Sequence, residues 1–281
     1  MLLRLKEELG SMTNAFDIIY VLEGNKPGAR IMYHGNKRIL RLLKDMGLDY
    51  ALSDYKVLKH TDKTRNYSDK GIKAARQDRR EGSFFLYVSR GREWAEEAKN
   101  AEAGGNDILL GKLLGYPECC VEFFEKHKKE AAETTNDFTV FTFRESSGIV
   151  FPWQNNFCLR GFDISLISHF PCSFKCGASR KTAESNFEVI EKYGHDVPAY
   201  FSSALKCGIM YAQGVGVYCF PGIKIEGRDL LYNPNQVIAS NRNELYGLIR
   251  KRDKITLLGR GHFRIRDIEI EDDHTFFGLF S

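Results

Sequence analysis

Two cysteine motifs, each containing a proline, place the strongest constraint on how this chain can fold. The first runs from Tyr116 to Cys120 (YPECC) and the second from His169 to Cys176 (HFPCSFKC). Proline suits the first turn of a helix, so each motif predicts a helix start. A helix opened by Pro171 would place Cys172 and Cys176, which are four residues apart, on one face. Because the positive end of a helix dipole stabilises thiolate, these sulfurs are candidates for chemistry.

The four cysteines are predicted to form one shared site. The two motifs lie about fifty residues apart, so the fold must bring distant segments together. Thiolate is the form that binds soft metals and attacks electrophiles. The sequence therefore predicts a metal or redox site built from the four sulfurs of Cys119, Cys120, Cys172 and Cys176.

His169 is the predicted catalytic residue of this site. It lies three residues before Cys172. A histidine beside two thiols is a better candidate for a metal ligand or a proton shuttle than a lone histidine elsewhere in a chain. Both roles remain open from the residues alone.

Known metal patterns narrow the choice of cofactor. A zinc deaminase needs a His-x-Glu sequence, which this chain lacks, and a Pro-Cys-x2-Cys spacing, whereas Cys172 and Cys176 are separated by three residues. Radical enzymes that use S-adenosylmethionine carry a third cysteine where this chain has Ser179. Adjacent Cys119 and Cys120 also depart from the Cys-x2–4-Cys knuckle of structural zinc sites. An iron–sulfur cluster fits best because its ligands can come from separate segments, and zinc is the alternative.

Composition predicts an ordinary globular protein of the cytoplasm. Of 281 residues, 43% are hydrophobic and 28% are charged, and no apolar run is long enough to span a membrane. The seven cysteines are an odd number, and a reducing compartment disfavours structural disulfides. The three cysteines outside the motifs, Cys158, Cys207 and Cys219, have apolar neighbours and are predicted to pack in the core.

A basic segment is the candidate surface for RNA or a nucleotide-like substrate. The chain carries a net charge of +4, which does not by itself demand nucleic acid. Between residues 56 and 81, however, the chain has nine Lys or Arg residues and only four Asp or Glu residues. Arg76, Arg79 and Arg80 are the predicted phosphate contacts. The alternative is a solvated surface without a partner.

The fold class predicted from the pattern of apolar runs is α+β, in three regions with soft boundaries. Residues 1–92 are predicted to form a small α/β layer, in which Asp17–Leu22 reads as a buried strand. Residues 93–205 are predicted to be helical and to carry the cysteine motifs. Residues 206–281 hold short apolar runs separated by glycines and are predicted to be rich in strands.

The two motifs resemble the signatures of an uncharacterised, mainly archaeal family, a domain of unknown function with paired GYPxCC and HFPCSxxC sequences. The resemblance covers about residues 105–200. The family name implies no activity. It does imply which positions matter: Gly115, Tyr116, Pro117, Cys119, Cys120, His169, Pro171, Cys172, Ser173 and Cys176.

The sequence thus predicts an intracellular metalloprotein, for which three alternative functions remain. The first is redox or sulfur-transfer chemistry on RNA or a nucleotide, carried out at a cysteine-held iron–sulfur cluster. The second is a zinc-stabilised module that binds nucleic acid without catalysis. The third is a thiol–disulfide protein in which Cys172 and Cys176 cycle. The oligomeric state does not follow from the sequence.

Overall fold

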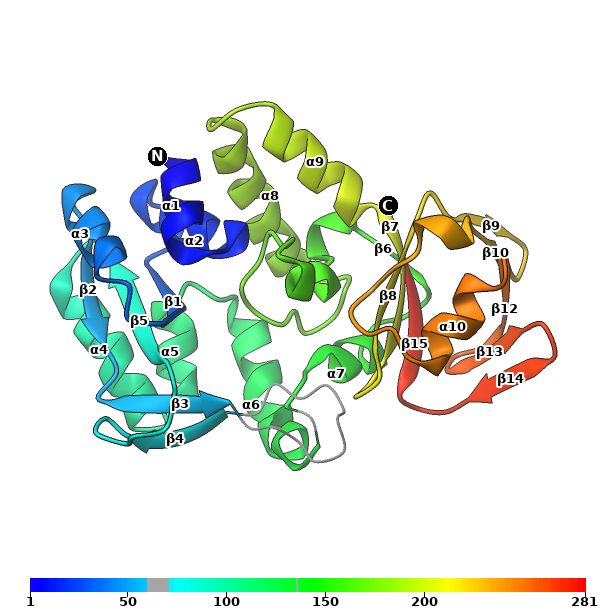
Figure 1. Cartoon of the computed structure of the whole chain (residues 1–281), viewed down its shortest axis with the longest axis horizontal. Helices are drawn as coiled ribbons and strands as arrows, with labels where there is room; N and C mark the ends of the chain where they lie inside the picture. The colour runs from blue at the N-terminus through cyan, green and yellow to red at the C-terminus, as the bar shows by residue number, and fades with distance from the viewer. Residues whose placement is uncertain (60–70, 135) are drawn as a thin grey trace.

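The structure is a computed structural model that describes residues 1–59, 71–134 and 136–281, and it has the predicted α+β class (Figure 1). Its N-terminal part is a three-stranded antiparallel sheet of order β1-β5-β2 beside a β3-β4 hairpin. The elements are α1 (Leu2–Leu9), α2 (Met12–Leu22), β1 (Gly28–Tyr33), α3 (Lys37–Asp45), β2 (Asp49–Leu52), β3 (Tyr55–Lys59), β4 (Gly71–Ala75) and β5 (Phe84–Ser89).

The prediction of a strand at Asp17–Leu22 is wrong, because these residues form the second half of helix α2. Ser11 caps that helix by accepting a hydrogen bond from the backbone N–H of Asn14. Asp163 accepts further bonds from the N–H groups of Met12 and Thr13. Every residue from Ala15 to Val21 is buried, so this helix has no exposed polar face. Its apolar residues therefore show no helical period, and the run resembles a buried strand.

Helices fill the middle of the chain, as predicted. They surround the two cysteine motifs and pack on the N-terminal sheet through α4 and on α2 through α8. The elements are α4 (Arg92–Ala103), α5 (Asp107–Leu113), α6 (Glu118–Glu133), α7 (Thr139–Arg144), the 3₁₀ turns η1 (Trp153–Asn155) and η2 (Cys158–Phe162), α8 (Gly177–Glu191) and α9 (Asp196–Leu205).

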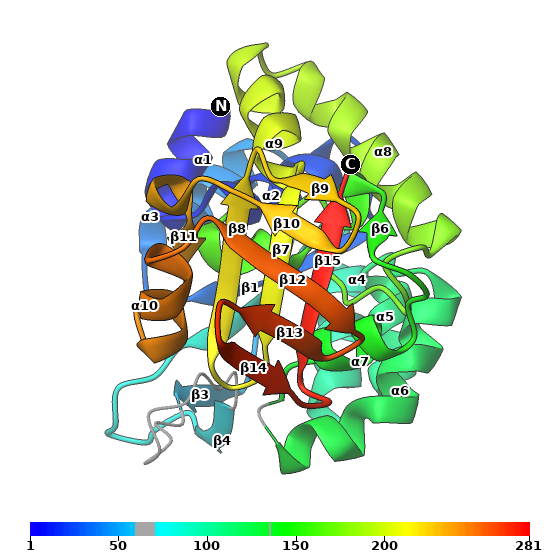
Figure 2. The same cartoon turned by 90° about the vertical axis from the view of Figure 1, so that its right-hand side faces the viewer.

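The C-terminal part is rich in strands, as predicted, and consists of two five-stranded sheets packed face to face (Figure 2). The first has the order β11-β8-β7-β15-β6 and the second β14-β13-β12-β10-β9. The elements are β6 (Val150–Phe151), β7 (Cys207–Ala212), β8 (Gly216–Pro221), β9 (Lys224–Glu226), β10 (Asp229–Leu231), η3 (Pro234–Gln236), β11 (Ile238–Ala239), α10 (Glu244–Arg250), β12 (Lys254–Gly259), β13 (His262–Ile265), β14 (Ile268–Glu271) and β15 (Thr275–Phe280).

Strand β15 joins the C-terminal sheets to the rest of the protein. Phe276 and Phe280 belong to the large core that begins at α1, whereas Phe277 lies in the core between the two sheets. This follows from the alternation of side chains along a strand. Cys158, Cys207 and Cys219 are buried, as the sequence predicted.

Candidate metal centre

The first motif lies in the tight connection between α5 and α6. Pro117 is the N-cap of α6, so Cys119 and Cys120 lie in its first turn. Gly115 has φ +73, and a Cβ there would lie 2.6 Å from Pro27 Cδ. Glycine is therefore required for the backbone conformation and for the close contact with the N-terminal part.

The second motif is a loop, and the prediction that Pro171 opens a helix is wrong. Helix α8 begins only at Gly177, after Cys176. The loop is held by tertiary contacts: Phe174 is fully buried, its N–H donates to Ser146 Oγ, and Asn155 donates to the carbonyls of Phe174 and Cys176. These contacts outweigh the local preference of Pro171 for a helix start.

Cys176 is the N-cap of α8. Its sulfur accepts a hydrogen bond from the backbone N–H of Ser179 at 3.4 Å, as a serine or aspartate oxygen does at other helix starts. The starts of α6 and α8 therefore both supply cysteines to the cluster. Both helix dipoles favour negative charge on those sulfurs.

The structure brings all four predicted cysteines together, and their Sγ atoms all lie within 4.8 Å of one another. Cys119 and Cys176 are 3.7 Å apart, Cys120 and Cys176 are 3.8 Å apart, and Cys119 and Cys120 are 3.9 Å apart. Adjacent Cys119 and Cys120 thus point to one centre, which the zinc-knuckle comparison did not anticipate. The group could hold a metal ion.

The crowded thiols make the cluster receptive to a cation. The pKa of Cys176 is lowered, because the thiols of Cys120 and Cys172 donate hydrogen bonds to its sulfur. The pKa of Cys120 is raised because its thiol donates to the sulfurs of Cys172 and Cys176 and because it is buried. Burial also raises the pKa of Cys119. One thiolate is therefore favoured without a metal, and a cation would favour the others by neutralising their charge.

Ser179 connects the cluster to His169. The hydroxyl of Ser179 lies 3.2 Å from Cys120 Sγ and 2.8 Å from Nε2 of His169. The group of potential ligands found in the described part of the chain contains the four cysteines and not His169. Burial, together with the positive charge of Lys26, lowers the pKa of His169 to about 3, so the ring is neutral at pH 7.

A buried ion pair supports the second motif from the N-terminal part. Lys26 Nζ lies 2.8 Å from a carboxylate oxygen of Asp17 and donates to Ser168 Oγ at 3.0 Å. Ser168 Oγ donates in turn to Asp17. Both members of the pair are almost fully buried. The residue next to His169 is thus tied to α2 and to the turn before β1.

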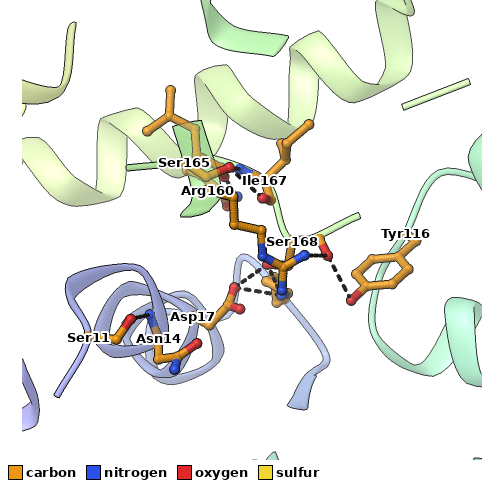
Figure 3. Close-up of polar contacts among 11 residues, drawn as sticks. Ser11, Asn14, Asp17, Tyr116, Arg160, Ser165, Ile167 and Ser168 are labelled. Atoms are coloured by element: carbon orange, nitrogen blue, oxygen red, sulfur yellow. Dashed lines mark hydrogen bonds and ion pairs between the residues drawn. The ribbon is translucent and has the colours of Figure 1, made fainter. Parts of the chain in front are cut away.

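Two further side chains donate hydrogen bonds to the backbone carbonyl of Ser168. Tyr116 Oη donates to the Ser168 carbonyl at 3.4 Å, and Arg160 donates to the same oxygen at 3.1 Å (Figure 3). The Tyr116 ring also packs on the ring of His169, with centroids 5.2 Å apart. Tyr116 therefore connects the first motif directly to the second.

Of the residues around the cluster, sequence reasoning missed Asp17, Lys26 and Arg160 as participants. Lys26 and Asp17 lie more than a hundred residues from Ser168 along the chain, and no local pattern marks them. Ser179 carries a weak signal, because it occupies the position that a third cysteine would take. It lies on the first turn of α8, and its backbone N–H donates a hydrogen bond to Cys176 Sγ.

The predicted nucleic-acid contacts lie on the surface of the N-terminal part. Arg76, Arg79 and Arg80 are exposed and follow strand β4. Arg80 is paired with Asp78 at 2.8 Å, and Arg76 lies 3.9 Å from Asp54. Residues 60–70 of the basic segment lie outside the described residues, and they include Lys63, Arg65 and Lys70.

The site therefore defines a candidate metal-binding protein with a four-cysteine centre. Residues 96–197 match the model of a family described as a protein of unknown function, DUF483. The match runs from α4 into α9 and contains all four cysteines. It confirms the resemblance to a family of unknown function. Among curated proteins and solved structures, nothing matches. None of the helices in the described ranges is long and apolar enough to cross a membrane.

Proposed function

We propose that the cysteine cluster binds a single tetrahedrally coordinated zinc ion that stabilises the centre of the protein. The observation that carries this proposal is the spacing of the sulfurs, three of whose separations are 3.7, 3.8 and 3.9 Å. A tetrahedron with metal–sulfur bonds of about 2.3 Å has edges of about 3.8 Å. The four sulfurs therefore fit one ion with little rearrangement.

An iron–sulfur cluster is the second candidate. It is favoured by the all-cysteine ligand set and by the exposure of Cys119, which gives access to the surface. In a cluster, cysteines on different irons are separated by iron and bridging sulfide. Their sulfurs would have to lie farther apart than 4.8 Å, the limit that encloses all four here. The spacing supports the single ion.

A stabilising role follows from the ligand count. Four protein sulfurs complete a tetrahedral shell, whereas catalytic zinc keeps a position open for water or substrate. Redox or sulfur-transfer chemistry would need an open position or a free thiolate. The module without catalysis is therefore the function that we infer. The ion would join the start of α6, the loop before α8 and the start of α8.

Metal and sulfide analysis of protein purified without oxygen tests this proposal. We expect about one zinc per chain, no acid-labile sulfide and no colour. Several irons with matching sulfide and a brown solution would instead establish the cluster. Protein that purifies without metal, does not take up added zinc and carries a Cys172–Cys176 disulfide would favour thiol–disulfide chemistry.

We further propose that Arg76, Arg79 and Arg80 contact RNA phosphates. Their exposure supports this, and Arg79 lacks an ion-pair partner among the described residues. Neutralising all three should weaken RNA binding. It should also reduce the slope of log binding constant against log salt concentration by up to about three. Neutralising Arg4, Arg38 and Arg41 gives a variant of the same charge change elsewhere on the N-terminal part. Absence of RNA binding at low salt, or equal loss in both variants, would contradict the proposal.

A further inference from the structure

A cavity of about 390 Å³ lies between the two C-terminal sheets and the loop that follows α7. Its apolar wall includes Phe143, Phe276 and Phe277, and the rings of Phe143 and Phe276 stack 5.3 Å apart. Ile149, which is 36% exposed, lies at its edge. The three Phe rings are 5% exposed or less, whereas Leu257 and Leu258, which also line the cavity, are only partly buried. The volume falls in the range of small-molecule sites, and the accessible aliphatic side chains suit an apolar body.

The cations around this cavity lack acidic partners. Arg228 and Arg260 both line it, and neither has a carboxylate within 4.0 Å in the part of the chain that the structure describes. Lys175 adds a third charge, because its Nζ lies 3.6 Å from where a Cβ on Gly148 would be. Gly148 is itself part of the cavity wall.

Arg260 is held in place for binding. Its guanidinium donates to the Phe143 carbonyl and lies over the Phe276 ring, 5.5 Å from the centroid. Guanidinium has five N–H donors, and this is the one hydrogen bond that it makes among the described residues. The remaining donors form a planar fork that matches carboxylate or phosphate.

Nearby acids are already engaged. A smaller cavity of about 300 Å³ shares Arg260 and Phe276 with the first and is also lined by Asp272 and Asp273. The Asp272 carboxylate accepts bonds from the N–H and hydroxyl of Thr275. Asp273 lies 3.6 Å from Arg144 and 2.8 Å from His274. Both carboxylates thus have other partners, and neither lies within 4.0 Å of the Arg260 guanidinium in the described residues, which leaves Arg260 available to an anion.

The cavity also borders the metal loop. Ser146 lines the cavity, and its Oγ accepts the N–H of Phe174 at 2.8 Å and lies 3.3 Å from Ser173 Oγ. Phe174 and Ser173 stand between Cys172 and Cys176. One residue thus forms both a wall of the cavity and a support of the cysteine loop.

We propose that this cavity binds a small anionic molecule with an apolar, ring-sized body, its anionic group on Arg260 and Arg228 and its body against Ile149, Leu257 and Leu258. Carboxylates and phosphate monoesters share the chemistry that the arginines recognise. The proposal does not depend on the metal or on RNA binding.

Titration of the full-length protein, as purified, with simple probes, followed by ligand-observed NMR, tests the site. Phenyl phosphate and benzoate distinguish the two kinds of anion, and inorganic phosphate and phenol each supply only one half of the ligand. We expect at least one of the first two to bind at millimolar concentration and more tightly than either half. Failure of both to bind at about 10 mM would overturn the proposal.

Substitutions locate the binding. Arg228→Gln and Arg260→Gln should each weaken binding of the better probe about tenfold or more, as expected for a lost charge-assisted hydrogen bond. Arg242→Gln removes an exposed arginine outside the cavity and should leave binding unchanged. Because Arg228 is exposed on a turn and packs little, its variant should fold even if Arg260→Gln does not. Unchanged binding in Arg228→Gln, or equal loss in Arg242→Gln, would place the probe elsewhere.

Discussion

The hydroxyl of Ser179 lies 2.8 Å from His169 Nε2 and gives this buried histidine its connection to the cysteine cluster. The same hydroxyl is 3.2 Å from Cys120 Sγ. When Cys120 is a thiolate, the hydroxyl donates to sulfur and accepts from the ring N–H. The His169 proton is then on Nε2. We therefore propose that His169 and Ser179 orient and stabilise Cys120 as a metal ligand without being ligands themselves.

His169→Ala and Ser179→Ala should therefore retain the metal at full stoichiometry and lower its affinity by about 10- to 100-fold, as loss of a supporting hydrogen bond does at other metal sites. Competition with a chromophoric chelator measures the affinity. The double variant should lose little more than either single one, because both act through one chain of bonds. His274→Ala, an exposed histidine, is the control. Complete loss of metal in His169→Ala would make that residue a ligand.

Gly115→Ala should destabilise the protein and weaken metal binding more than Gly47→Ala. Both glycines have φ +73, so both substitutions carry the same backbone strain. Only at position 115 would the new Cβ meet another atom, Pro27 Cδ, at 2.6 Å. Urea unfolding should show an excess cost of about 1–3 kcal/mol at position 115. Equal costs would mean that the contact with Pro27 is unimportant.

The Lys26–Asp17 pair should behave as a buried ion pair. Lys26→Met leaves the Asp17 carboxylate buried without its cation and should cost about 3–5 kcal/mol of unfolding free energy. Lys26→Met with Asp17→Leu should recover much of this loss, because both charges are then gone. Urea unfolding of the zinc-loaded variants measures the cycle. A single variant within about 1 kcal/mol of the wild type would show that the pair is not effectively buried.

Asp163 should make stability depend on pH. Burial opposes its ionisation, but hydrogen bonds from Ser11, Met12 and Thr13 outweigh burial and lower its pKa. A lowered folded pKa means that the stabilisation is present above the unfolded pKa of about 3.9 and is lost as pH falls through the folded value. Asp163→Asn should thus cost about 1 kcal/mol at pH 7 and progressively less below about pH 4.

Asp163→Asn suits this test because asparagine tolerates the left-handed backbone at position 163, where φ is +63. Asp267→Asn, at an exposed aspartate, is the control. A cost that does not change between pH 7 and pH 3.5 would show that the charge of Asp163 contributes nothing.

The cysteine site could be predicted from sequence because its motifs are local and its residue types are rare. Cys119, Cys120, Cys172 and Cys176 meet as expected. The backbone that presents them was predicted only in part, since the burial of Phe174 and the bonds from Asn155 override the helix signal of Pro171. Such tertiary contacts leave no periodic trace in the chain.

The fold shows the same division. The helix at Lys37–Asp45 ends two residues before Gly47, and the helix at Arg92–Ala103 ends at Gly104, so a local stop signal marks both in the sequence. The helix over Asp17–Leu22 was missed because it is buried along most of its length and loses its amphipathic period. Its cap comes from Ser11 together with Asp163, and the second of these lies far along the chain.

X-ray absorption at the edge of the metal that purifies with the protein tests the central claim most directly. One tetrahedral ion on four cysteines predicts a zinc edge with about four sulfur neighbours at about 2.3 Å. It also predicts the absence of nearby metal–metal scattering and of nitrogen or oxygen ligands. An iron edge with a metal–metal shell, or a zinc shell containing nitrogen from His169, would contradict it.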